Sequence, residues 1–201
     1  MTRNVAILIF DQVEVLDFCG PFEVFGVTGR RAAGDPPFSV YTVSEQAEPV
    51  LARNGLSVNP NFTIYNCPPP DILLVPGGYG TRQQMHNESL LAWIREQAER
   101  VELLLSVCTG ALLLAKADLL TGLAATTHWA AMDELKNVAP ATELRPTARY
   151  VDNDKIILSA GVSAGIDMSL YVVARLLGDA QAAETARHMQ YDHWTGSAAK
   201  A

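Results

Sequence analysis

A cysteine stands at the point where one apolar run of the sequence meets another. Residues 103–115 read LLLSVCTGALLLA, with Cys108 between the two runs. The stretch Ser106-Val107-Cys108-Thr109-Gly110 is typical of a nucleophile elbow, a sharp strand-to-helix turn that requires small neighbours. A thiol at a helix N-terminus is stabilised as thiolate by unpaired N–H groups and the helix dipole. We therefore expect Cys108 to be reactive, with a pKa below about 8.5, against the simpler alternative of a core cysteine.

Several other groups could assist this thiol. The backbone N–H of Thr109 would point at an anion beside the sulfur. Gly77 and Gly78 could supply a second donor, because glycine lets the backbone approach a ligand closely. Asp17 could donate a proton if its pKa is raised, or it could only cap a helix. His128 could activate the thiol as a Cys-His pair, although sequence does not show whether its ring reaches the sulfur.

Composition excludes several classes of function. The chain has 201 residues, which predicts one domain over 1–201. A net charge of −7 gives no electrostatic footprint for nucleic acid or an anionic membrane. The apolar run at 5–10 is too short for a signal peptide or a membrane span. Three cysteines without C-x-x-C spacing argue against a disulfide framework or a metal site, and we expect a cytoplasmic protein.

The elements that must position these groups follow from the hydrophobic pattern. Nearly continuous apolar runs predict buried parallel strands at 4–10, 38–43, 71–76, 101–107 and 155–160. Helical patterns cover 20–30, 87–100, 163–179 and 180–194, and the VDNDK stretch predicts a hairpin turn. Alternating strands and helices indicate an α/β domain with a mostly parallel sheet. Ligands bind at the carboxyl ends of such strands, where Asp17, Gly77-Gly78 and Cys108 would gather.

The chain is similar to the ThiJ/PfpI superfamily over nearly its whole length. The motifs that carry the resemblance are LDFCGPFEVF (16–25), DILLVPGG (71–78), SVCTGALLLAKADLL (106–120), ATTHW (125–129) and SAGVSAGIDMSL (159–170). The resemblance implies a flavodoxin-like three-layer sandwich with a mostly parallel central sheet and a cysteine at a nucleophile elbow.

Within the superfamily the chain most resembles the isonitrile hydratases, which add water to R–N≡C and give an N-substituted formamide. This resemblance implies Cys108 as nucleophile, Asp17 as acid and Thr109 as an assisting residue. It also implies a small-molecule isonitrile substrate, a homodimer, and no cofactor or metal. The chain departs from the pattern at Cys19, where Thr is expected, and around Asp192, where a Pro-rich ending is expected.

Two other branches fit less well, and two functional alternatives stay open. Protease-like members place His after the nucleophile, where this chain has Thr109. Regulators of the AraC type add a helix-turn-helix domain, for which we expect no room in 201 residues. The same thiol could act on 2-oxoaldehydes, as glyoxalase-like relatives do. It could also serve a ligand-binding or redox-sensing module.

Overall fold

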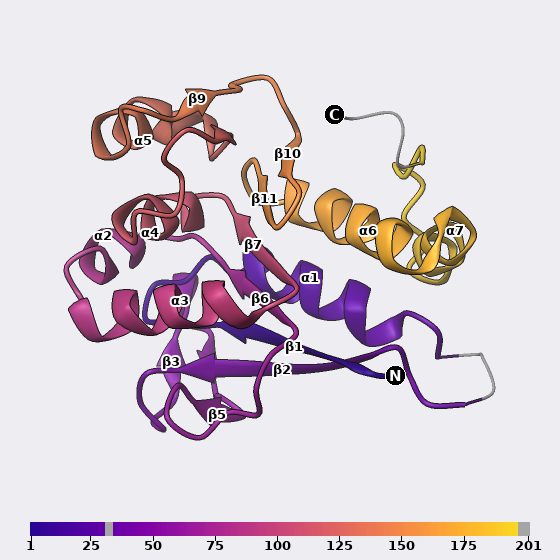
Figure 1. The fold of residues 1–201 in the computed structure, drawn as a ribbon. Helices are drawn as coiled ribbons and strands as arrows, with labels where there is room; N and C mark the ends of the chain where they lie inside the picture. The colour runs from indigo at the N-terminus through magenta and orange to yellow at the C-terminus, as the bar shows by residue number, and fades with distance from the viewer. Residues whose placement is uncertain (31–33, 197–201) are drawn as a thin grey trace.

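A seven-stranded sheet forms the centre of the computed structural model, which describes residues 1–30 and 34–196 (Figure 1). Its strand order is β10-β11-β7-β6-β1-β2-β5. The strands are β1 (Arg3–Leu8), β2 (Phe38–Ser44), β5 (Phe62–Thr63), β6 (Ile72–Val75), β7 (Leu103–Val107), β10 (Tyr150–Asn153) and β11 (Ile156–Ser159). All neighbours pair in parallel except β10 and β11, which confirms the predicted, mostly parallel sheet.

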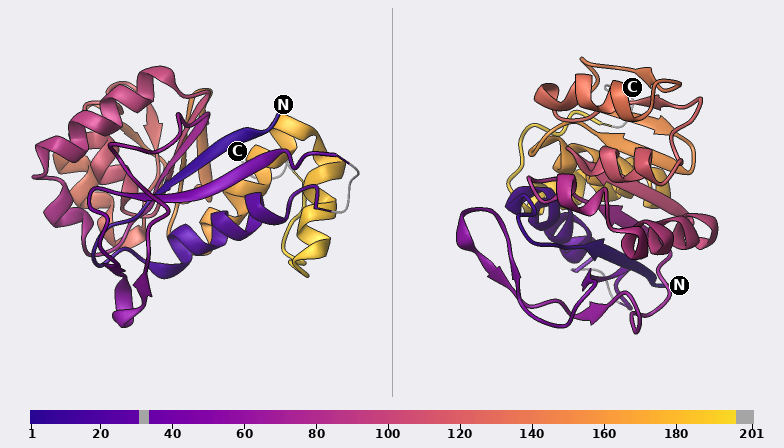
Figure 2. Two further views of the ribbon diagram at one scale, coloured as in Figure 1. Left: turned by 90° about the horizontal axis from the view of Figure 1, so that it is seen from below. Right: turned by 90° about the vertical axis from the view of Figure 1, so that its left-hand side faces the viewer.

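Helices cover both faces of this sheet and complete a three-layer arrangement (Figure 2). One layer holds α1 (Val15–Val27), α6 (Ala164–Leu177) and α7 (Asp179–His188). The other holds α2 (Thr81–Gln84), α3 (Glu88–Arg100) and α4 (Gly110–Lys116). No helix within the described residues combines the length and apolar character needed to cross a membrane.

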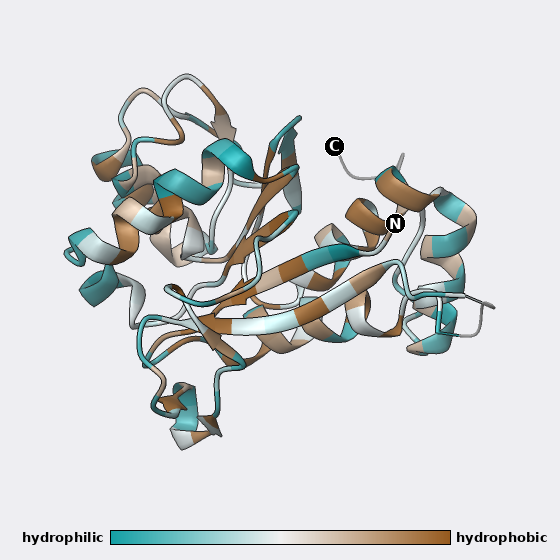
Figure 3. Ribbon diagram, turned by 60° about the horizontal axis from the view of Figure 1, so that its bottom comes forward, coloured by the Kyte–Doolittle hydropathy of each residue, from teal (hydrophilic) through white to brown (hydrophobic). Residues whose placement is uncertain are grey.

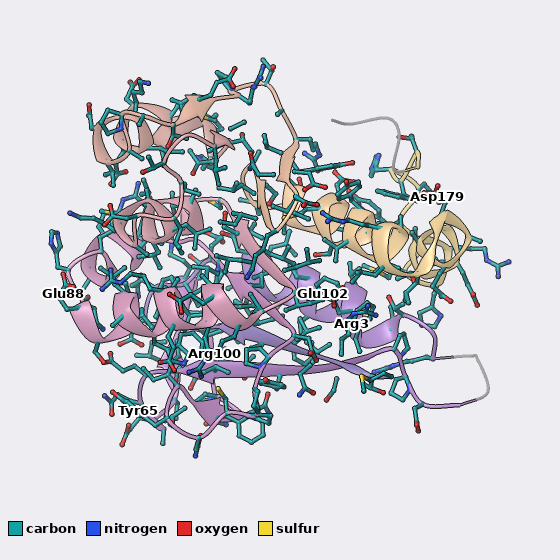
Figure 4. All side chains as sticks on the ribbon, in the orientation of Figure 1. Arg3, Tyr65, Glu88, Arg100, Glu102 and Asp179 are labelled. Carbon is teal, nitrogen blue, oxygen red and sulfur yellow. The ribbon has the colours of Figure 1, made fainter. Side chains whose placement is uncertain are left out.

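The core lies between the sheet and these helices. Figure 3 shows apolar residues concentrated along the central strands. Every residue of β6 and β7 is buried, as expected for parallel strands covered on both faces. Arg3, at the amino end of β1, and Glu102, just before β7, form an ion pair of 2.6 Å; both are labelled in Figure 4.

Two small two-stranded sheets are separate from the central sheet. A hairpin of β3 (Val50–Leu51) and β4 (Ser57–Val58) carries the 3₁₀ turn η1 (Arg53–Gly55). A cap contains β8 (Ala124–Ala125), η2 (Trp129–Ala131), α5 (Met132–Val138) and β9 (Glu143–Leu144). The sequence pattern did not predict these short pieces, although both supply residues to the candidate site.

The predicted helix ends are partly confirmed. Asn87 caps α3 by accepting a 3.2 Å hydrogen bond from the Leu90 N–H. The predicted hairpin turn before β11 is also present, with Asp154 at φ 70°. Helix α1, however, begins at Val15 rather than near Gly20, so Pro21 lies inside it. Because proline has no N–H, it leaves a carbonyl of the preceding turn without its helical partner. The last predicted helix ends at His188 rather than 194.

Candidate active site

The expected nucleophile elbow is present at the end of β7. Cys108 follows Val107 with φ 57°, a left-handed conformation that costs energy in any residue except glycine, and α4 starts at Gly110. A Cβ on Gly110 would lie 2.1 Å from the carbonyl oxygen of Val75 on the neighbouring strand. Glycine at this position therefore lets the helix start directly against the sheet, and the turn lifts the thiol out of the strand.

Asp17 is placed beside this thiol by the first turn of α1. Its side chain is fully buried, and Oδ2 accepts a 3.0 Å hydrogen bond from the backbone N–H of Gly77. Oδ1 has no hydrogen-bond partner within the described residues. The N-cap of α1 is Glu14, so the interpretation of Asp17 as a helix cap is wrong. A fully buried carboxyl group beside a thiol is typical of a site that handles a proton.

Burial and proximity change the acidity of both groups. Loss of hydration raises the pKa of the Asp17 carboxyl to about 7, against the lowering effect of the Gly77 N–H. Burial, and then the neighbouring Asp17 carboxylate, raise the pKa of the Cys108 thiol to about 12. The backbone N–H groups of Thr109 and Val162 act in the opposite direction, because they stabilise a thiolate. The expected lowered thiol pKa is thus contradicted: burial and a nearby carboxylate outweigh the donors at the elbow.

Thr109, in the elbow, forms hydrogen bonds with the loop that contains Gly77 and Gly78. The Gly78 N–H donates a 2.9 Å hydrogen bond to Thr109 Oγ1, and the hydroxyl of Thr81 lies 3.2 Å from the same atom. The N–H groups of Gly77 and Gly78 are therefore both bonded within the protein, and neither is free for a ligand as the sequence suggested. Their role in this structure is to hold Asp17 and Thr109 in place.

His128 lies in the wall of the site rather than against the sulfur. Its Nδ1 accepts a 3.3 Å hydrogen bond from the Ala130 N–H and caps η2. The ring packs over Gly161, where a Cβ would lie 2.3 Å from Cδ2 of the imidazole. His128 and Cys108 line the same cavity, yet the imidazole hydrogen bonds to Ala130 and not to the thiol. The structure therefore does not show a Cys-His pair.

The thiol opens into a cavity of about 260 Å³. Its lining consists of Glu14, Arg53, Gly78, Tyr79, Arg82, Cys108, Thr109, His128, Ala130, Ala131 and Val162. Sequence reasoning missed the charged and aromatic part of this wall, because the charged residues come from loops whose place depends on tertiary contacts. It also missed Val162, whose φ of 52° is unusual for a β-branched residue. Gly161, which precedes Val162 and follows β11 by two residues, is the sequence signal that could have indicated this turn.

Asp192 and Cys19, at which the sequence departs from the family pattern, lie outside the lining of this cavity. Asp192 lines a different, open hollow with Arg187 and Trp194, beyond α7. Cys19 is half-buried on α1 and packs against the core, and burial raises its pKa. Neither residue lines the cavity that contains Cys108.

Comparison with known proteins shows the family of this chain. The family model described as the DJ-1/PfpI family matches residues 3–175. The chain belongs to the DJ-1/PfpI family. It is 36% identical over 178 residues to the isonitrile hydratase of Pseudomonas putida, covering 89% of this chain and 74% of that protein. It is 29% identical to the transcriptional regulator CdhR of Pseudomonas aeruginosa, of which the match spans 52%.

Several solved structures have the same fold as this chain. A ThiJ/PfpI family protein from Pseudomonas syringae matches with a TM-score of 0.86 and 31% identity, over 96% of this chain and 76% of that one. DJ-1β from Drosophila melanogaster matches with a TM-score of 0.82 at 18% identity, over 96% and 100% of the two chains. The DJ-1/PfpI fold thus includes enzymes and regulators, and the site chemistry has to distinguish between them.

Proposed function

We propose that this protein hydrates isonitriles, R–N≡C, to N-substituted formamides, with Cys108 as nucleophile and Asp17 as the proton carrier. The observation that carries the proposal is the fully buried Asp17 carboxylate, which lies beside a thiol at a nucleophile elbow and whose pKa is raised to about 7 by burial. The similarity to an isonitrile hydratase at 36% identity supports this choice of substrate.

The first half of the reaction joins sulfur to the substrate. Ionised Asp17 accepts the thiol proton while the sulfur lone pair forms a bond to the terminal isonitrile carbon. The N–H groups of Thr109 and Val162 stabilise the negative charge that develops on sulfur. Asp17 then delivers the proton to the lone pair of the same carbon. The product is a covalent thioimidate, R–N=CH–S–Cys108, and Asp17 is ionised again.

The second half uses one water molecule and regenerates the thiol. Water adds to the thioimidate carbon while Asp17 accepts a proton and passes it to nitrogen, which gives a tetrahedral adduct. The C–S bond then breaks and its electron pair returns to sulfur. The proton of the adduct's hydroxyl group returns through Asp17 to Cys108, and the formamide R–NH–CHO is released. The sum of the steps is the addition of one water to the isonitrile.

Thr109 assists in this proposal through its backbone rather than its hydroxyl. The N–H lies beside the sulfur, whereas Oγ1 accepts the hydrogen bond from Gly78. His128 contributes the shape of the cavity wall. A reactive free thiol needs a reducing compartment, so we also propose that the protein acts in the cytoplasm.

Formamide formation from a simple alkyl isonitrile is the experiment that tests the proposal. Wild-type protein should produce the N-alkyl formamide, and Cys108→Ser should not, because the hydroxyl is a far weaker nucleophile than the thiol. Methylglyoxal consumption should be assayed in parallel, because the same thiol could act on 2-oxoaldehydes. Consumption of methylglyoxal without formamide production would replace the proposal with glyoxalase-like chemistry.

A further inference from the structure

Arg53 lies at the cavity wall and is fixed there by the loops around it. Its backbone N–H donates a 2.9 Å hydrogen bond to the carbonyl of Val13, on the segment that leads into α1. Its guanidinium carbon lies 3.7 Å from the centre of the Tyr79 ring. Stacking on an aromatic ring holds a guanidinium in place without occupying its N–H donors. Arg53 is therefore a positioned cation at the wall of the cavity that contains Cys108.

The guanidinium of Arg53 forms one long ion pair and no hydrogen bond within the part of the chain that the structure describes. Its nearest carboxylate is Glu14, with Nη1 of Arg53 at 3.7 Å from Oε2, too long for a hydrogen bond. Within the described residues, no acceptor forms a hydrogen bond with the Arg53 side chain. Arg82, the other arginine of the cavity, differs because both oxygens of the Glu134 carboxylate already accept hydrogen bonds from it. Arg53 thus has hydrogen-bonding capacity to spare and Arg82 has much less.

We infer that Arg53 binds a carboxylate on the substrate, so that the preferred isonitriles are small acids that carry both R–N≡C and COO⁻. This inference rests on the proposed function and names its substrate class. A planar guanidinium matches a carboxylate in a bidentate geometry, and a cavity of about 260 Å³ suits a small molecule. Glu14 opposes the binding of an anion, and its distance from Arg53 leaves donors open for a second carboxylate.

Two thiol reagents test the inference without requiring isonitrile turnover. Iodoacetate and iodoacetamide alkylate the same sulfur and differ in carrying a carboxylate or a neutral amide. The measured quantity is the ratio of their rate constants at Cys108, followed by mass spectrometry. Arg53→Gln should lower the ratio by roughly tenfold or more, the effect of losing a hydrogen bond to a charged group. Glu14→Gln should raise it, and Arg53→Lys should give an intermediate value.

Arg100→Gln is the matched control. It removes the same charge at the end of α3, next to the amino end of β7 and away from the cavity (Figure 4). The ratio at Cys108 in Arg100→Gln should equal the ratio at Cys108 in wild type. The ratio at Cys67 should be the same in wild type and in every variant. If Arg53→Gln and Arg100→Gln give the same ratio within twofold, Arg53 does not recognise the carboxylate and the inference is overturned.

Turnover then separates this inference from the proposed function. With isocyanoacetate and its neutral amide as substrates, wild type should prefer the acid in kcat/KM, and Arg53→Gln should lose most of that preference through KM. Turnover of isonitriles with no preference for the acid, together with an unchanged alkylation ratio, would refute only the carboxylate site. An Arg53-dependent alkylation ratio without turnover of any isonitrile would refute only the hydratase activity.

Discussion

Asp17 and Cys108 are buried together at the carboxyl edge of the sheet, and the carboxylate makes the thiol a weaker acid. Burial raises the pKa of Asp17 to about 7, and burial with the neighbouring carboxylate raises that of Cys108 to about 12. Above about pH 7 the pair therefore carries one proton, which lies on sulfur, and the ionised carboxylate beside it can accept that proton. This arrangement suits a nucleophile that is deprotonated as it attacks rather than one stored as thiolate.

The first prediction concerns the reactivity of Cys108 toward iodoacetamide. In wild type the alkylation rate should keep rising with pH above 9, because burial and then the Asp17 carboxylate oppose ionisation of the thiol. Asp17→Asn removes that negative charge, so its alkylation profile should move to lower pH. The rate is measured at each pH by mass spectrometry, with Cys108→Ser to identify the reacting site. A wild-type titration below about 8.5 would contradict the role assigned to the carboxylate.

The second prediction concerns stability against pH. The pKa of Asp17 is about 7 in the folded protein and about 3.9 in an unfolded chain. Between these values the folded state holds a proton that the unfolded state has lost, so wild-type stability should fall as pH rises from about 4 to 7. Asp17→Asn avoids this penalty and should be more stable at pH 8 by roughly 4 kcal/mol, with little gain near pH 4.

Thermal unfolding of both proteins at pH 5 and pH 8 measures this difference. The gain in Tm of Asp17→Asn over wild type should be larger at pH 8 than at pH 5. An equal gain at both pH values would show that Asp17 titrates at an ordinary pKa in the folded protein.

The third prediction concerns the glycine that holds the pair. A Cβ on Gly77 would lie 2.5 Å from the Thr109 backbone nitrogen and 2.9 Å from Asp17 Oδ2. Gly77→Ala should therefore displace the carboxyl from the thiol, lower kcat strongly and cost about 1–3 kcal/mol of stability. Gly26→Ala is the control, because a Cβ there meets no atom within 4 Å and alanine favours the helix. Full activity in Gly77→Ala would show that the contact does not position Asp17.

The fourth prediction is the homodimer that we propose from the family resemblance. Leu16, Cys19 and Phe22 follow one another at intervals of three on α1, and Leu16 and Phe22 are among its exposed large apolar side chains. Light scattering should give about twice the 21.8 kDa of one chain, and Phe22→Glu should dissociate the dimer. A mass of one chain for wild type at micromolar concentration would contradict this proposal.

The central strands β6 and β7 were predictable because they are buried on both faces. The apolar run at 101–107 became β7 (Leu103–Val107), and the small residues around Cys108 marked the elbow, since Gly110 leaves no room for a side chain. Pro21 is typical of a helix start and predicts α1 from Gly20, whereas the helix begins at Val15 and buries Asp17 and Phe18 in its first turns.

The charged part of the site was not predictable from local pattern. Arg53 lies in a short exposed turn whose position depends on hydrogen bonds from its own N–H to Val13 and from Leu51 to Asp11. Val162 adopts a positive φ against the preference of a β-branched side chain, so only the neighbouring Gly161 indicates a turn at this position. The expectation of a lowered pKa for the Cys108 thiol was wrong for the same reason, because the depth at which the chain buries Cys108 depends on tertiary packing.

The most direct test of the central claim is kcat for Asp17→Asn on an alkyl isonitrile. Asparagine keeps the shape of the side chain and can accept the hydrogen bond from Gly77, but it cannot carry a proton between sulfur, carbon and water. Loss of such acid–base catalysis typically costs about 10²–10⁴-fold, so kcat should fall by that factor while Cys108 remains present and the protein folded. A kcat within about threefold of wild type would contradict the claim that Asp17 carries the proton for Cys108.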